Sequence, residues 1–231
     1  MAIPTRNRFA VRTFAAVVCG TAGIALSATV TSAEATGWSA AMGDATRGEA
    51  RATELYCNVC HGPAGNSVTP QWPVLAGQHA GYLAEQLSLF RPRERTNIEM
   101  APLAAMLTDA DILDLAAYYA AQTPTPTSAP PPGAGEAGEM AAAKLYAEGE
   151  VARGIAACAS CHGKTGGGDP AQRTPALHGQ QAIYAIKQLK DYAARARYTK
   201  NGALAEQMSV LAAKLSVEEM NGLGNWLQSL R

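Results

Sequence analysis

The pentapeptides Cys57-Asn58-Val59-Cys60-His61 and Cys158-Ala159-Ser160-Cys161-His162 decide how this 231-residue chain is interpreted. Both have the spacing C-x-x-C-H, which is typical of c-type haem attachment. Two thioether bonds then hold the vinyl groups of a haem, and the adjacent imidazole reaches its iron. We therefore predict two covalently bound haem c groups, one held by Cys57 and Cys60 and the other by Cys158 and Cys161, with His61 and His162 as iron ligands.

Two other uses of such cysteines are weaker. A thiol redox pair has no need of the histidine that follows each motif. A structural zinc site would require the two pairs to meet across about 100 intervening residues. The occurrence of the complete motif twice favours haem.

The two halves of the chain repeat one another around these motifs. Sliding the sequence against itself aligns the motifs at an offset of 101 residues, and the match continues at offsets of 102 and then 108. Because polar residues and glycines stay in step, the match indicates two copies of one module rather than shared alanine content. The later pairs include Pro73 with Pro175, Gln78 with Gln180, Tyr82 with Tyr184, Gln86 with Gln188, Arg95 with Arg197 and Met100 with Met208.

A proline-rich segment separates the modules. Residues 123–138 read TPTPTSAPPPGAGEAG, with five of the thirteen prolines and no large apolar side chain. Such a composition cannot bury a core, so we predict an extended Pro/Ala-rich linker. It divides the chain into a first module at residues 34–122 and a second module at residues 139–231.

Both modules have the apolar periodicity of helices, and no alternating strand pattern competes, which predicts an all-α fold. A short helix is expected from about Asp44 into Cys57. A second helix carries Tyr82, Gln86 and Phe90 on successive turns.

The last helix of each module is the most clearly marked. Thr108 and Ser216 each stand three residues before an acidic side chain, as N-terminal capping residues do. An apolar face follows each cap. These faces consist of Ile112, Leu115, Ala116 and Tyr119 in the first module and of Met220, Leu223, Gly224 and Leu227 in the second.

The opposite side of each iron needs a further ligand, and methionine sulfur is the usual choice at high potential. Three of the seven methionines lie in the leader or near a module start. The repeat separates the other four, because Met100 aligns with Met208, whereas Met106 and Met220 align with residues of other types. We predict Met100 and Met208 as iron ligands, and Met106 and Met220 as packing residues.

Two further pairs are candidates for roles around the haems. The carbonyls of Pro73 and Pro175 could accept the Nδ1 proton of the histidine ligands, or these could be plain turn prolines. Arg95 and Arg197 could pair with haem propionates, since a guanidinium group binds a carboxylate as a fork, or they could be solvated surface residues. The sequence leaves both alternatives open.

The N-terminal residues have the pattern of an export signal. Three arginines precede an apolar stretch over residues 14–30, and small residues follow. The stretch is interrupted by glycines and is short for a membrane helix, so we expect a signal peptide at residues 1–33, cleaved near Ala33 or Ala35. We therefore expect a periplasmic protein that associates with membranes only through its partners.

The charge balance argues against a nucleic-acid partner. The chain has 19 basic and 19 acidic residues, and removal of residues 1–33 would take away three arginines and no acids. The remaining chain is mildly acidic and lacks the concentrated positive charge that nucleic-acid binding needs. We expect redox proteins as partners and no nucleic acid.

Taken together, these segments resemble class I cytochromes c fused in tandem, and most closely the dihaem cytochrome c4 family. The resemblance covers about residues 43–231 and rests on the C-x-x-C-H motifs, the P-x-L-x-G-Q segments, the Tyr/Gln helices and the methionine segments. It implies two cytochrome c domains related by a pseudo-twofold axis, with His/Met ligation of both haems. It also implies a periplasmic carrier from a quinol-oxidising complex to a terminal oxidase. The Pro/Ala-rich linker departs from the family pattern.

An electron carrier without enzymatic activity is the leading hypothesis, because an iron with two protein ligands has no open position for a substrate. One alternative is the cytochrome subunit of a flavin-containing, sulfide-type dehydrogenase, which would differ only in its docking surface. A dihaem peroxidase would need an open iron. A site resembling thiosulfate dehydrogenases would want a further cysteine ligand, and the sequence after the leader has only the four motif cysteines.

Overall fold

A computed structural model describes residues 43–126, 136–197 and 202–230. The export signal expected at residues 1–33 lies outside the described residues, as does part of the linker. The described segments form helices joined by turns, with two isolated bridges and no longer strand. The all-α prediction is confirmed.

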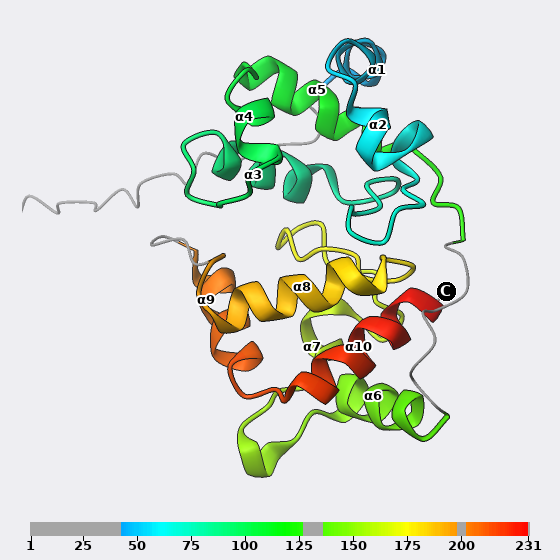
Figure 1. The fold of residues 1–231 in the computed structure, drawn as a ribbon, viewed down its shortest axis with the longest axis vertical. Helices are drawn as coiled ribbons and strands as arrows, with labels where there is room; N and C mark the ends of the chain where they lie inside the picture. The colour runs from blue at the N-terminus through cyan, green and yellow to red at the C-terminus, as the bar shows by residue number, and fades with distance from the viewer. Residues whose placement is uncertain (1–42, 127–135, 198–201, 231) are drawn as a thin grey trace, which may run out of the picture. The chain divides into compact units, whose positions relative to one another are not determined.

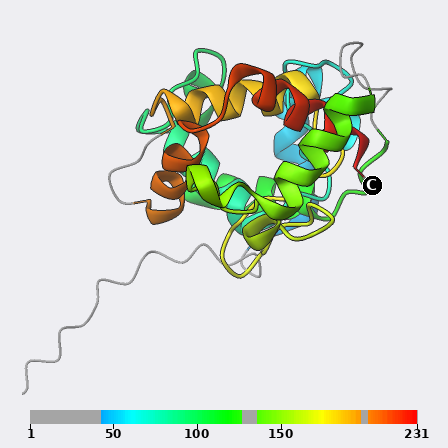
Figure 2. The ribbon, with the colours of Figure 1, turned by 90° about the horizontal axis from the view of Figure 1, so that it is seen from below.

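In the described residues each module has the same succession of five α-helices, while the 3-10 turns differ in place, and Figure 1 shows the modules as two separate groups. Seen from below, the helices of the second module lie around its periphery (Figure 2). The first module consists of α1 (Ala45–Glu54), α2 (Cys57–His61), the 3-10 turn η2 (Pro63–Gly65), α3 (Ala80–Phe90), α4 (Met100–Ala104) and α5 (Asp109–Ala120). The second consists of α6 (Glu136–Glu148), the 3-10 turn η3 (Val151–Arg153), α7 (Ala159–His162), α8 (Ala182–Ala193), α9 (Ala203–Ala212) and α10 (Val217–Ser229).

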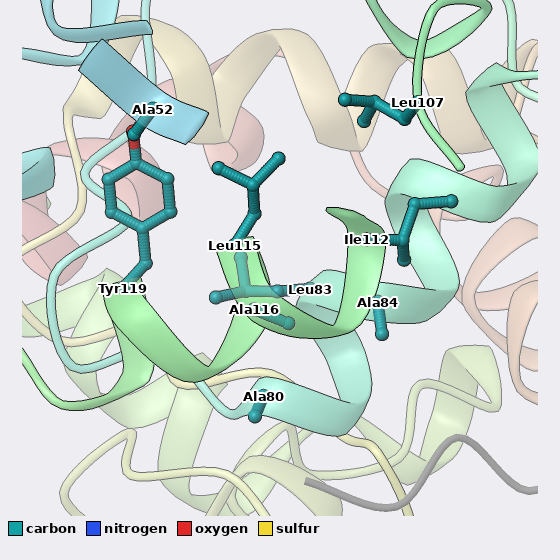
Figure 3. Packing of buried hydrophobic residues seen from close by; sticks show 9 residues of the cluster. All are labelled: Ala52, Ala80, Leu83, Ala84, Leu107, Ile112, Leu115, Ala116 and Tyr119. Atoms are coloured by element: carbon teal, nitrogen blue, oxygen red, sulfur yellow. The ribbon is translucent and has the colours of Figure 1, made fainter. Parts of the chain in front are cut away.

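The last helix forms the centre of each module. Helix α5 packs against α1 and α3, and α10 packs against α6 and α8. Both helices begin with the predicted capping box, Thr108 with Asp111 and Ser216 with Glu219. Both predicted apolar faces are buried. Figure 3 shows the face of α5 together with side chains from α1 and α3.

A close helix crossing explains one glycine of the first module. A Cβ atom on Gly48 of α1 would lie only 2.0 Å from the carbonyl oxygen of Asp114 in α5. The side chain of Asp114 accepts hydrogen bonds from Arg47 Nε at 2.7 Å and from Asp44 N at 2.7 Å. The crossing therefore joins the start of α1 to the middle of α5.

Three sequence expectations differ from the structure. The linker at residues 123–138 is predicted to be extended, but α6 begins within it, at Glu136. The helix from Asp44 ends at Glu54, because Tyr56 has φ of 55° and its left-handed backbone separates α1 from α2. Met106 was predicted to pack in a core, but it is 52% exposed. Its aligned residue, Lys214, is also exposed, so the position faces solvent in both modules.

The apolar segments of the described helices are short. None of these helices combines the length and hydropathy that a bilayer span requires.

Candidate haem sites and the module boundary

The two motifs occupy equivalent places in the modules. Cys57, Cys60 and His61 lie in α2, while Cys158 directly precedes α7, which contains Cys161 and His162. A glycine with φ near 75° ends each helix directly after its histidine. Both histidines are buried, with exposed fractions of 7% and 6%.

A proline carbonyl fixes each imidazole ring. His61 Nδ1 donates to Pro73 O at 3.1 Å, and His162 Nδ1 donates to Pro175 O at 3.0 Å. A carbonyl oxygen only accepts, so Nδ1 carries the proton and the lone pair remains on Nε2. Burial lowers the pKa of both rings, which keeps them neutral. A neutral imidazole with a fixed tautomer suits a metal ligand.

The cysteines have the opposite character from a thiol redox pair. Burial raises the pKa of the Cys57 and Cys158 thiols, whereas thiols that react as redox pairs have a depressed pKa. In each motif the second cysteine adds a smaller contribution that raises the pKa of the first in the same direction as burial. Across the three described segments, no three His, Cys, Asp or Glu side chains are grouped as a metal site.

The methionines predicted as ligands lie at the start of α4 and within α9. Met100 and Met208 are both half-buried, and Asn97 Oδ1 accepts from Met100 N at 2.6 Å. The carboxylate of Glu99, next to Met100, raises the pKa of His61 against the larger effect of burial. The segment before α4 therefore lies within electrostatic reach of this ring. Met220 is buried in α10, as predicted.

A cluster of six polar side chains, here called the arginine cluster, joins the modules. It consists of Tyr82, Gln86 and Arg95 from the first module and their counterparts Tyr184, Gln188 and Arg197 from the second. Arg95 Nη2 donates to the Tyr184 hydroxyl, and Arg197 Nη2 donates to the Tyr82 hydroxyl, both at 3.1 Å. Each glutamine Oε1 accepts from both arginines at 2.8 to 3.0 Å. The bonds are reciprocal, as a pseudo-twofold axis requires.

The backbone conformation just before each arginine places its side chain in this cluster. Arg93 and Arg195, two residues before them, have positive φ of 63° and 57°, a conformation that costs about 1 kcal/mol or more for a non-glycine residue. The guanidinium groups of Arg95 and Arg197 then lie 4.3 and 4.4 Å from the ring centroids of Phe90 and Tyr192. The same left-handed turn stands two residues before the buried arginine in both modules, so it fixes the path of the backbone that places the arginine side chain.

The arginines are not surface residues, since each is 7% exposed. Their hydrogen-bond partners in the described parts of the chain are neutral phenols and amides, and no ion pair there includes either arginine. Two neighbouring buried cations are costly without an anion. The site therefore fits a cofactor that carries carboxylates, as haem does.

A second set of bonds crosses the boundary beside the proline carbonyls. Gln78 binds the backbone of Ala176, and Gln180 binds the backbone of Val74. Their neighbours extend the contact, because His79 Nε2 donates to Gly167 O at 2.8 Å and Gln181 Nε2 donates to Ser67 O at 2.6 Å. The internal repeat pairs these glutamines but does not by itself indicate their role. Their recurrence as polar residues beside a turn in both modules is the sequence feature that could have indicated a shared structural role.

Comparison with known proteins identifies the family. The cytochrome c family model matches residues 45–121 and 140–231. A cytochrome c4 from Thiocapsa roseopersicina is 42% identical over 190 residues, which cover 82% of this chain and 94% of that protein. The thiosulfate dehydrogenase electron acceptor of Thiomonas intermedia (strain K12) is 33% identical over 172 residues, covering 74% and 76% of the two chains.

The fold agrees with this assignment. The crystal structure of reduced recombinant cytochrome c4 from Pseudomonas stutzeri has a TM-score of 0.73 to this chain at 34% identity, covering 82% of this chain and all of that one. The predicted pair of tandem cytochrome c domains is thus confirmed. The chain belongs to the cytochrome c family, as a dihaem member of the cytochrome c4 type with two covalently bound haem c groups.

Proposed function

We propose that this chain is an exported periplasmic electron carrier that links a quinol-oxidising complex to a terminal oxidase. The observation that carries the proposal is the duplicated, buried histidine whose Nδ1 proton is held by a proline carbonyl. Haem bound there supplies one-electron exchange between ferric and ferrous iron. Two such sites in one chain suit a carrier that holds two electrons.

Specific residues of the chain hold the two groups. Cys57 and Cys60 form the thioether bonds of the first site, with His61 and Met100 as iron ligands. Cys158 and Cys161 form those of the second site, with His162 and Met208 as ligands. With two protein ligands, each iron would have no open position for a substrate, which favours a carrier over a peroxidase.

The arginine cluster fits a role in binding propionates. Arg95 and Arg197 are buried without an acidic partner in the described residues, and a fork of N–H donors matches a carboxylate. We infer that propionate oxygens supply the missing negative charge. Tyr82 and Tyr184 would hold the guanidinium groups in place from the opposite module.

A second candidate donor is a thiosulfate dehydrogenase. It is favoured by the relative from Thiomonas intermedia, whose name describes an electron acceptor of that enzyme. The haem sites would be the same and only the docking surface would differ. A third candidate role is that of the cytochrome subunit of a flavin-containing dehydrogenase. Co-purification of a stable complex with a flavoprotein would support this role.

Electron exchange with purified donors tests these roles. The oxidised protein is mixed in a stopped-flow instrument with a quinol-oxidising complex and quinol, or with thiosulfate dehydrogenase and thiosulfate. We expect full reduction of both haems by the first system, at a rate that changes with ionic strength. Faster reduction by the second system would establish the second candidate, and reduction by neither would overturn the carrier role.

Cell fractionation tests export, with haem staining expected in the periplasmic fraction.

A further inference from the structure

A single peptide group lies between the first ligand histidine and the second module. This is the peptide bond from Pro73 to Val74. Its oxygen accepts from His61 Nδ1 at 3.1 Å, and its N–H donates to Gln180 Oε1 at 2.8 Å. His61, Pro73 and Val74 belong to the first module, whereas Gln180 belongs to the second.

The reverse arrangement is present as well. The peptide bond from Pro175 to Ala176 accepts from His162 Nδ1 at 3.0 Å, and its N–H donates to Gln78 Oε1 at 2.9 Å. Each module therefore supplies a glutamine to the peptide that holds the other module's histidine. The relation is crossed, so it exists only when the two modules are docked.

Each glutamine is held in one orientation. Gln180 Nε2 donates to Val74 O at 3.0 Å, and Gln78 Nε2 donates to Ala176 O at 2.9 Å. Each Oε1 also accepts from the next backbone N–H in its own module, at 3.0 Å. Both side chains are buried, with 9% and 7% exposed. Turning either amide away would leave buried polar groups without partners, which is costly.

Hydrogen bonds in series through one amide polarise one another, because donation by the N–H increases the negative charge on the carbonyl oxygen. A more negative Pro73 oxygen binds the His61 Nδ1 proton more strongly and makes the imidazole a stronger electron donor. We propose that Gln180 and Gln78 are positioning residues that act across the module boundary, each lowering the reduction potential of the other module's haem through one peptide group. This inference rests on haem ligation by His61 and His162 in the proposed function.

Substitution of one glutamine tests the crossed relation. Gln180→Met keeps the side-chain length and removes both hydrogen bonds to Val74. We expect the Nδ1 proton of His61 to move upfield in the NMR spectrum of the reduced dihaem protein, while that of His162 stays in place. We also expect the first haem to become easier to reduce by about threefold in equilibrium constant, or roughly 30 mV for one electron. Gln78→Met should affect His162 and the second haem instead.

The neighbouring residue provides a matched control. Gln181→Met makes the same chemical change at the next position, and it also removes a buried bond across the boundary, to Ser67 O. This bond does not involve the peptide that holds His61, so neither the proton resonance nor either potential should move. If Gln181→Met shifted the first haem as much as Gln180→Met, or if Gln180→Met shifted nothing, the inference would be overturned.

Gln180→Glu keeps the inference testable if Gln180→Met does not fold. A neutral carboxyl group can accept from Val74 N and donate to Val74 O, so the wild-type potential is expected at low pH. Its ionised form is a stronger acceptor and should lower the potential of the first haem alone. No change on ionisation would contradict the inference. A chain without two haems would overturn the proposed function as well, whereas a dihaem protein with unmoved potentials would overturn this inference only.

Discussion

Arg197 of the second module donates a 3.1 Å hydrogen bond to the hydroxyl group of Tyr82 in the first. The counterpart bond from Arg95 to Tyr184 has the same length. The boundary between the modules is thus held in part by reciprocal bonds of buried polar groups. Loss of one member leaves a buried partner unsatisfied, which costs more than the bond itself contributes.

Arg197→Lys should destabilise the protein by about 2 kcal/mol, because lysine cannot reproduce the planar fork that reaches Tyr82, Gln86 and Gln188. Urea unfolding of the dihaem protein measures this change. Arg195→Lys is the control, since Arg195 is exposed and pairs with Glu206 on the surface, where changes stay within about 0.5 kcal/mol. Equal effects of the two substitutions would contradict a special role for the cluster.

Asp114→Asn should change how the free energy of unfolding depends on pH under acidic conditions. The hydrogen bond from Arg47 holds the pKa of Asp114 below its ordinary value. A carboxyl whose pKa is depressed by folding contributes stability above its unfolded-state pKa, near 4, and loses that contribution as the pH falls through the folded-state pKa. The wild type should therefore lose stability more steeply than the variant below about pH 4.

At pH 7 the same variant should be less stable by about 1 kcal/mol, since Arg47 is largely exposed and solvent weakens the pair. Thermal unfolding at several pH values gives both results. Asp109→Asn, in the first turn of the same helix, removes an exposed carboxylate that pairs with Arg91 and serves as control. Parallel curves for the wild type and Asp114→Asn would refute this account of Asp114.

Met100→Ala and Met208→Ala should each open one iron. In each variant we expect half of the near-infrared methionine-to-iron band of the oxidised protein to disappear. One carbon monoxide binding site should appear in the reduced protein. Met106→Ala should change neither property, because Met106 is 52% exposed. An intact band in either of the first two variants would remove that methionine from the ligand set.

Gly48→Ala should destabilise the first module by about 2–3 kcal/mol, because the added Cβ would lie 2.0 Å from Asp114 O and the helices would have to separate. Gly222→Ala is also a helical substitution, and its Cβ would have its nearest neighbour at 3.5 Å, an ordinary contact. Alanine there should stabilise by about 0.5 kcal/mol through its higher helix propensity. Denaturant unfolding that ranks the two variants the other way would contradict this packing.

The features that could be predicted from the sequence depend on local patterns. The caps at Thr108 and Ser216 depend on a hydroxyl group and an acid three residues apart, and the apolar faces behind them depend on helical periodicity. The internal repeat then extended these predictions from one module to the other. Met106 aligns with Lys214 in the repeat, and a lysine at the equivalent position indicates exposure to solvent. This alignment could have corrected the prediction that Met106 packs in a core.

The features that escaped prediction depend on contacts between distant segments. Gln180 and Val74 are 106 residues apart, and their bonds exist only because the modules dock. Burial of Arg95 and Arg197 is likewise a property of the boundary, so the sequence left their surface and buried alternatives open. The break at Tyr56 requires a left-handed backbone that the side chain itself does not favour.

The mass of the intact, denatured protein tests the central claim most directly. Covalent attachment at Cys57 and Cys60, and at Cys158 and Cys161, predicts a polypeptide mass increased by two haem groups that survive acid-acetone extraction. Replacement of Cys158 and Cys161 by serine should leave one such increment. A wild-type protein that carries one haem or none after extraction would contradict the account.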